Sequence, residues 1–352
     1  MIATNASKYY IIAFVPKKCF NEIIQKMIGK ILKNVVHQLL IKCIIIKNKF
    51  GDKLSDWMLP EGTEEEKFRI SILRNDINSL PKLQEKDSIV SEQEWDRHRM
   101  TLRDHIMRLD PRNFLRWPVV ISTMFFSGKI VELEYLKSLP DWAEYDKAIT
   151  ESTIGKPKNF PDFKRSSGNL IHHAYSIALF SETFSLKIKS CHNIFEFGGG
   201  YGSLVRFMYQ FGFTGKYIIF DLPEFSFLQK YYLSGIPRLG IDFNKNTERT
   251  EKVVSLTTTI EQSVNSVGNK PLDIFIALWS LSECPIALRE EIFKLLPLPK
   301  YFLIAYQEKF NNIDNVDYFK KLAILRPEYR WIDFPILHLP GNRYFFGKKI
   351  EG

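Results

Sequence analysis

From about residue 193 onward the chain alternates short apolar segments with amphipathic ones, and this alternation limits the fold more than any other feature. Apolar runs that suit strands occur at Asn193–Phe197, Tyr217–Asp221, Lys252–Leu256, Asp273–Trp279 and Tyr301–Tyr306. The segments between them have helical spacing, which predicts a parallel sheet covered on both faces. At the end, Tyr329–Leu337 and Arg343–Gly347 flank a Pro-Gly-Asn turn and predict an antiparallel hairpin. We therefore expect an α/β fold with a mostly parallel sheet and an antiparallel C-terminal hairpin.

A glycine-rich loop, Gly198-Gly199-Gly200-Tyr201-Gly202, follows the first expected strand and precedes a helix. Glycines at such a place let the backbone turn tightly and approach a ligand. The GxGxxG pattern of dinucleotide sites would need glycine where the chain has Ser203. Glu196, two residues before the loop, would repel a diphosphate but suits a ligand with an ammonium and a sulfonium group. The loop resembles the first motif of class I methyltransferases, which implies S-adenosylmethionine as the cofactor.

A second acid, Asp221, ends the next expected strand, 25 residues after Glu196. A carboxylate there can accept hydrogen bonds from both hydroxyls of a ribose, or it can cap the helix that begins near Pro223. Two acids at successive strand ends around the glycine loop are a more specific signal than the glycines alone. The cofactor-binding residues expected from these motifs are Glu196, Gly198, Gly200, Tyr201, Gly202, Asp221, Leu222 and Ser280.

Six segments together resemble the sugar O-methyltransferases encoded among bacterial cell-surface polysaccharide genes. They are Asp110–Trp117, Ser167–Tyr175, the glycine loop, Tyr217–Glu224, Ile276–Pro285 and His338–Asn342. The resemblance spans roughly residues 65 to 348 and implies methyl transfer to a sugar hydroxyl in glycan or polysaccharide biosynthesis, with a Rossmann-like class I methyltransferase sheet. It also suggests substrate contacts at Asn169, Arg112, Trp117 and Asn342. Trp117 would stack on a sugar ring, although a surface salt bridge explains Arg112 equally well.

Transfer to a hydroxyl requires alignment of the acceptor oxygen with the methyl group and removal of a proton. We expect the base near the carboxyl ends of the strands. The candidates are His173, Glu283 and His338, each of which also has a purely structural interpretation. His172 and His173 point about 100° apart on a helix, so only one can face a given site, and the family resemblance favours His173. The sequence contains no cluster of carboxylates that would indicate a metal site.

The net charge of +9 is unevenly distributed along the chain. Residues 1–60 hold ten Lys and Arg against three Asp and Glu, so seven of the nine charges lie there. We interpret this segment as a basic arm and linker with an amphipathic helix at 19–46, which either contacts an anionic membrane surface or packs on the body or a second subunit. Residues 61–160 are expected to form a helical cover over the active site, and residues 161–352 the methyltransferase domain.

Because the body beyond residue 60 is nearly neutral, we expect no nucleic-acid partner. The four cysteines are far apart and no run of about 18 apolar residues occurs. These features predict a cytoplasmic protein, peripheral at the inner face of the membrane if the arm binds there.

Three other functions remain open from the sequence. Methylation of a small aromatic or polyketide-like hydroxyl fits the Asp-Leu-Pro at residues 221–223, but enzymes of that type carry a histidine base after the fourth strand, which this chain lacks. RNA methylation fits the pI near 9.1, yet Trp279-Ser280-Leu281-Ser282 stands where amino methyltransferases have an Asn/Asp-Pro-Pro-Tyr motif. The third open function is that of a binding module without catalytic activity.

Overall fold

The computed structural model describes residues 59–83, 90–237, 239–243 and 253–351. The amphipathic helix expected at 19–46 lies outside these ranges. Residues 58–352 form one compact unit. None of the helices in the described ranges is long and apolar enough to cross a membrane.

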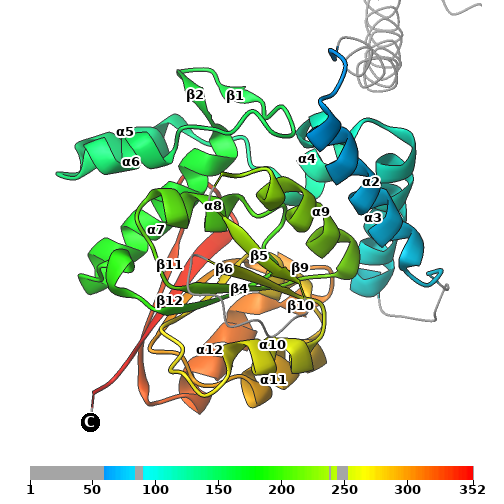
Figure 1. Ribbon diagram of the computed structural model, residues 1–352. Coiled ribbons are helices and arrows are strands. Elements are labelled where there is room, and N and C mark those ends of the chain that lie inside the picture. Colours follow the sequence, from blue (N-terminus) through cyan, green and yellow to red (C-terminus); the bar gives the residue numbers. More distant parts are fainter. Residues whose placement is uncertain (1–58, 84–89, 238, 244–252, 352) are drawn as a thin grey trace, which may run out of the picture. The chain divides into compact units, whose positions relative to one another are not determined.

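An eight-stranded sheet forms the centre of this unit (Figure 1), in the order β11-β12-β8-β7-β3-β4-β6-β5. Its strands are β3 (Asn193–Phe197), β4 (Lys216–Phe220), β5 (Gly240–Phe243), β6 (Val253–Thr257), β7 (Ile274–Leu278), β8 (Tyr301–Gln307), β11 (Tyr329–Pro335) and β12 (Asn342–Lys349). All pairings among β3 to β8 are parallel, and β12 runs antiparallel to both β8 and β11. The predicted sheet is confirmed, and β5 is an edge strand that the sequence did not reveal.

The chain enters the sheet at β3 and leaves it in two directions. It first builds β4, β5 and β6 on one side, then returns to build β7 and the rest on the other side of β3. The order therefore reverses between β3 and β7. In open α/β sheets the carboxyl ends of strands at such a switch point form the ligand crevice. The topology alone points to the loops that follow β3, β4 and β7.

Helices cover both faces of the sheet. One face carries α7 (Gly168–Phe184), α8 (Ser203–Gln210) and α9 (Pro223–Ser234), and the other carries α10 (Ile260–Val267), α11 (Ile286–Leu295) and α12 (Asn315–Leu325). Successive residues of the central strands alternate between the two cores, because side chains of a strand point to opposite faces. Ile194 packs in the first core and Phe195 in the second.

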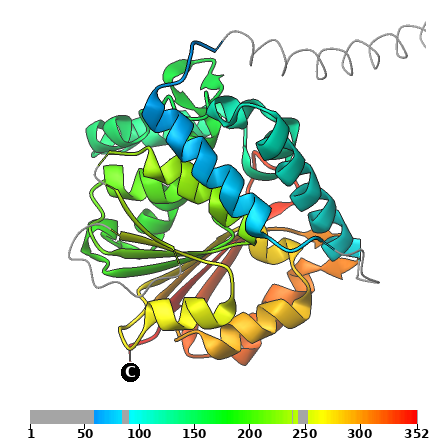
Figure 2. The ribbon, with the colours of Figure 1, turned by 45° about the vertical axis from the view of Figure 1, so that its right-hand side comes forward.

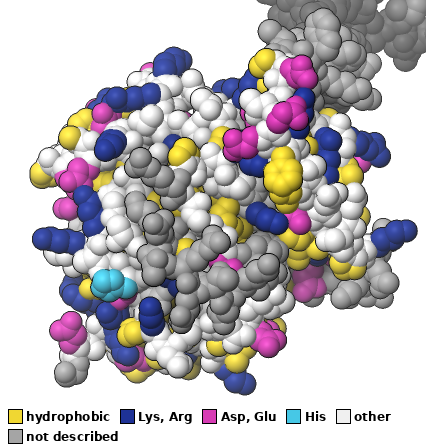
Figure 3. Space-filling view, in the orientation of Figure 1, with side chains coloured by type: hydrophobic (Ala, Val, Ile, Leu, Met, Phe, Trp, Pro, Cys, Tyr) yellow, Lys and Arg dark blue, Asp and Glu magenta, His cyan; other side chains and the backbone are white. Residues whose placement is uncertain are grey.

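The N-terminal described region adds a helical layer on the α7–α9 side. It contains α2 (Glu64–Ser79), α3 (Val90–Arg108), the 3₁₀ helix η1 (Pro111–Arg116), α4 (Pro118–Met124), α5 (Ile130–Ser138) and α6 (Trp142–Ala148). Figure 2 shows α2, in blue, beside α3, and α2 also packs on α9. A hairpin of β1 (Asn159–Phe160) and β2 (Phe163–Ser167) spans the boundary expected at residue 160. On the face drawn in Figure 3, Lys and Arg side chains lie among Asp and Glu side chains.

Candidate functional site

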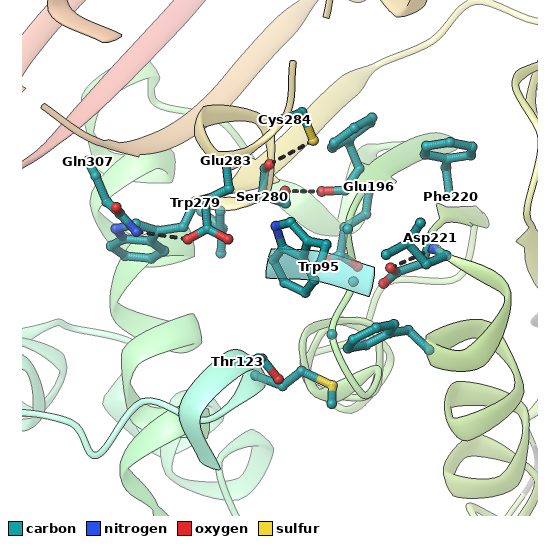
Figure 4. A pocket seen from close by; sticks show the side chains of 18 of the residues that line it. Trp95, Thr123, Glu196, Phe220, Asp221, Trp279, Ser280, Glu283, Cys284 and Gln307 are labelled. Carbon is teal, nitrogen blue, oxygen red and sulfur yellow. Dashed lines mark hydrogen bonds between the residues drawn. The ribbon is translucent and has the colours of Figure 1, made fainter. Parts of the chain in front are cut away.

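A pocket of about 990 Å³ lies at the carboxyl ends of β3, β4 and β7. One wall comes from the loops that follow these strands, which we call the sheet wall. The opposite wall comes from α3, the end of α4 and the start of α7, which we call the helical wall. In the view of Figure 4, Trp95 of the helical wall lies between Glu283 and Asp221 of the sheet wall.

The glycine loop adopts a backbone that other residues rarely accept. Gly198, Gly200 and Gly202 have φ of +73°, +56° and +91°, in the left-handed region. A Cβ on Gly198 would lie 2.3 Å from the Cβ of Ser280, so this glycine also permits the close approach of the β3 and β7 loops. Gly198 and Gly200 line the pocket, whereas Gly202 lies behind it as the N-cap of α8.

The two strand-end acids lie side by side in the pocket. The hydroxyl of Tyr217 donates to Glu196 Oε2 at 3.0 Å, and the Gln229 amide donates to Asp221 Oδ2 at 2.8 Å and to the Gly200 carbonyl at 2.9 Å. Burial raises the pKa of Glu196 to about 8 and that of Asp221 to about 7. Among the described residues neither carboxylate forms an ion pair. The pocket therefore holds two buried carboxyl groups whose ionised forms a bound cation or hydroxyl donors would stabilise.

The segment after β7 forms the third part of the sheet wall. Trp279 has φ of +67°, unusual for a bulky side chain, and its indole Nε1 donates to Asn342 Oδ1 at 2.6 Å. The Ser280 hydroxyl donates to the Phe197 carbonyl, which ties this segment to β3. Glu283, in the 3₁₀ helix η3 (Ser280–Glu283), accepts from the Gln307 amide at 2.8 Å. Burial raises the pKa of Glu283 to about 7.

The adjacent histidines of α7 have different partners. His172 Nδ1 lies 2.6 Å from Oε1 of Glu132 on α5, and His338 Nε2 lies 2.8 Å from the same oxygen. Burial opposes ionisation of Glu132, yet the hydrogen bond and charge of His172 and the hydrogen bond from His338 lower its pKa below the usual range. His173 Nδ1 lies 2.8 Å from the Ser203 hydroxyl, and burial lowers the pKa of His173 to about 3.

Of the three residues expected to serve as base, His173 and Glu283 line the pocket. His338 does not line it, but shares Glu132 as a hydrogen-bond partner with His172, which does. His172, which the sequence did not favour, lines the pocket too. No sequence signal singles out Glu132, because it lies 40 residues before His172 in an ordinary helical segment.

The residues expected to bind substrate fall into two groups. Asn169 and Asn342 line the pocket, although the Asn169 amide is already engaged with Tyr201, Ser203 and the backbone of Phe126. Arg112 and Trp117 are not among the lining residues. Arg112 is paired with Asp110 at 2.5 Å, and Trp117 is fully buried with its indole donating to Asn113 at 3.1 Å. In this structure neither side chain reaches the pocket.

Tyr201 and Leu222, two of the residues expected to bind the cofactor, both lie at the pocket wall. Tyr201 is nearly fully buried, with its ring 5.1 Å from that of Tyr232 and 5.9 Å from that of Phe114. Its side chain thus serves mainly as packing behind the glycine loop.

Helix α3 supplies wall residues that sequence analysis missed. Trp95 packs edge-on against Phe225 at 5.7 Å, and Arg99 donates to the fully buried carboxylate of Glu224 at 2.8 Å. Arg103 binds the other oxygen of Glu224 at 2.5 Å. Positions 92, 95, 96 and 99 have the three- and four-residue spacing of one helix face, which is the signal that could have identified them. Within the described ranges, no group of three or more His, Cys, Asp or Glu side chains could hold a metal ion.

Among known proteins, similarity to this chain is found in solved structures. No family model matches the chain, and no curated protein matches its sequence. Among solved structures, a magnesium protoporphyrin IX methyltransferase from Synechocystis with bound SAM is 11% identical, with a TM-score of 0.36, over 65% of this chain and 99% of that one. A SAM-dependent methyltransferase from Aquifex aeolicus is 13% identical, with a TM-score of 0.33, over 50% and 89% of the two chains.

An rRNA methylase from Streptococcus thermophilus is 12% identical, with a TM-score of 0.33, over 46% of this chain and 88% of that one. The order of the strands defines the fold. Strand β12 lies between β8 and β11 and runs antiparallel to both, next to a parallel sheet. This chain has the Rossmann-like α/β fold of class I methyltransferases.

Proposed function

We propose that this protein is an S-adenosylmethionine-dependent O-methyltransferase that transfers a methyl group to a sugar hydroxyl. The observation that carries the proposal is the pair Glu196 and Asp221, buried at adjacent strand ends around a left-handed glycine loop and without an ion-pair partner among the described residues. S-adenosylmethionine carries an ammonium, a sulfonium and two ribose hydroxyls. These groups match the charge and hydrogen-bonding capacity of the two acids.

Each part of the sheet wall has a role in this proposal. Glu196 would hold the ammonium end, and Asp221 would accept from the ribose hydroxyls while Gln229 keeps its carboxylate in place. The backbone at Gly198–Gly200 would lie along the methionine part, because no side chain there narrows the pocket. Aromatic side chains of Trp95, Phe220 and Phe225 give the pocket apolar surface for a purine. When bound, the cofactor supplies an electrophilic methyl group.

Binding of the cofactor is tested directly by calorimetry with the full chain. Asp221→Asn should weaken S-adenosylmethionine binding by roughly tenfold or more, since a hydrogen bond to a charged group contributes about 1.5–3 kcal/mol. The exposed Asp162→Asn should bind like the wild type. Absence of any binding heat with the wild-type chain would sink the proposal.

The acceptor class rests on the family resemblance of the sequence and on the composition of the pocket. Trp279, Gln307 and Asn342 combine an aromatic ring with amide groups, which suits a polyhydroxyl acceptor. Incubation with methyl-labelled cofactor and a panel of nucleotide sugars, glycans, small phenols and bulk RNA would identify the class. Label in a nucleotide sugar or glycan is expected. If label appeared only in RNA or only in phenols, the proposed sugar acceptor would be wrong and the labelled class would be the acceptor.

A further inference from the structure

The cofactor half of the site does not use the buried pair Glu132–His172. Building on the proposed function, we propose that Nε2 of His172 is the general base that removes the proton from the acceptor hydroxyl, and that Glu132 is its positioning residue. Neither residue belongs to the acids and glycines of the sheet wall. His172 lies on the helical wall, opposite the proposed cofactor site, and Glu132 on α5 binds it from outside the pocket lining.

The hydrogen bonds of Glu132 assign the tautomer of the neutral His172 ring. Oε2 of Glu132 accepts from the backbone N–H of Lys129 at 3.1 Å, and Oε1 faces the two imidazoles. Because a carboxylate only accepts, the Nδ1 of His172 carries a hydrogen and donates it at 2.6 Å. When the ring is neutral, the opposite nitrogen, Nε2, bears the lone pair that a general base needs.

The position of the ring turns this lone pair away from Glu132. His172 lines the pocket, whereas Glu132, which binds Nδ1, does not, so Nε2 lies on the side of the ring away from Glu132. Nε2 is buried and has no hydrogen-bond partner within the described ranges. The ring lies 4.3 Å from that of Phe126 and 5.0 Å from that of Trp279, which fixes its orientation. A hydroxyl of the acceptor would complete the hydrogen bonding of this atom.

The neighbouring His173 is a weaker choice for the same task. Its Nδ1 is engaged by Ser203, whose hydroxyl also accepts from Asn169 at 2.9 Å, and it has no carboxylate partner among the described residues. Burial also disfavours the charged form of His173. An imidazole that gains a proton during the reaction needs a nearby negative charge. Only His172 of the pair has one.

The step balances without a further reactant. The acceptor oxygen gives its proton to Nε2 of His172 and forms a bond to the methyl carbon, while the bond between that carbon and sulfur breaks and leaves its electron pair on sulfur. Glu132 stabilises the imidazolium that results. The charged and titratable groups that face His172 are Glu132, His338 through the shared oxygen, and His173.

The decisive experiment compares His172→Gln with the exposed His192→Gln in the full chain. We expect His172→Gln to lower kcat by about 10²- to 10⁴-fold with an unchanged Kd for S-adenosylmethionine, and His192→Gln to match the wild type in both. If the wild-type chain neither binds the cofactor nor transfers methyl, the proposed function fails. If it does both and His172→Gln keeps the full rate, only this inference is overturned.

Two further readouts separate a base from a packing residue. In Glu132→Gln the imidazolium formed in the reaction loses its carboxylate partner, so kcat should fall while the Kd for S-adenosylmethionine stays unchanged. Imidazole added to His172→Gly should restore part of the rate. Nitrogen-15 spectra of the full chain with S-adenosylmethionine need no acceptor: they should show His172 protonated on Nδ1 and not on Nε2 near neutral pH. The opposite tautomer would overturn the assignment.

Discussion

The sheet wall and the helical wall of the pocket are built in different ways. On the sheet wall, Glu196, Gly198 and Asp221 follow directly from strand ends, so a few consecutive residues determine their place. The contacts of the helical wall join distant segments. Arg99 meets Glu224 across 125 positions, and Glu132, which binds His172 of this wall, meets His338 across 206. A site of this kind has one half set by local sequence and one half set by tertiary packing.

The largest expected effect tests how the helical wall is attached. Glu224→Gln removes the buried carboxylate that binds both Arg99 and Arg103, so the free energy of unfolding should fall by about 3 kcal/mol. Urea unfolding followed by circular dichroism measures the change. Glu65→Gln, which breaks an exposed i,i+4 pair with Arg69, is the matched control and should change stability by under about 1 kcal/mol. Equal effects of the two substitutions would mean that α3 is held by other contacts.

The next effect tests the sheet wall. Gly198→Ala places a Cβ 2.3 Å from Ser280 at φ of +73°, and both strain and overlap must be relieved by moving the loop. Overpacking costs about 1–3 kcal/mol, so cofactor affinity should fall by roughly 10- to 100-fold in calorimetry. Gly268→Ala is the control, since its φ is +63° but the nearest atom to the new Cβ is 3.8 Å away. If the control lost as much affinity as Gly198→Ala, global destabilisation would explain both.

The same division explains which parts of the fold could be predicted. Apolar runs fixed the central strands to within a few residues, because buried parallel strands leave a continuous hydrophobic signature. Strand β5 was missed since Gly240–Phe243 has only four residues, two of them Gly and Asp, and owes its pairing to β6.

Within the site, the limits of sequence reasoning have a physical origin as well. Helical spacing shows that His172 and His173 face different directions, but only the placement of α5 decides which of them meets a carboxylate. Trp117 illustrates the converse. Its aromatic ring suits sugar stacking by type, yet the packing of η1 and α4 buries it completely. The residue type therefore shows what chemistry a side chain can perform, and long-range packing determines whether that side chain reaches the pocket.

A smaller effect concerns pH and the two acids of the sheet wall. The pKa values of about 8 for Glu196 and 7 for Asp221 describe the ligand-free pocket, where burial favours the protonated forms. The ligand binds the ionised forms, so affinity for S-adenosylmethionine should rise between pH 6 and pH 8, by roughly tenfold from Asp221 alone and further from Glu196. Asp221→Asn should reduce this dependence. A flat affinity profile in the wild type would mean that neither acid changes its protonation on binding.

Stability of the ligand-free chain should change with pH in the opposite direction. Both acids have folded-state pKa values above the unfolded values near 4, so the folded protein holds more protons between about pH 4 and 8. Their contribution to stability is complete below the unfolded pKa and is lost as pH rises through 7 to 8. Comparing urea unfolding of the wild type and Asp221→Asn at pH 6 and pH 8 isolates the part due to Asp221.

The smallest effect concerns the contact between Trp279 and Asn342, which joins the segment after β7 to the start of β12. Trp279→Phe keeps a ring beside His172 but removes the indole donor of the 2.6 Å hydrogen bond, so unfolding free energy should fall by about 1 kcal/mol. Asn342→Ala should cost a similar amount. In a double-mutant cycle the two losses should be markedly less than additive, because both variants remove the same bond. Additive losses would show that the bond contributes little and that Trp279 keeps its unusual backbone for packing against the helical wall.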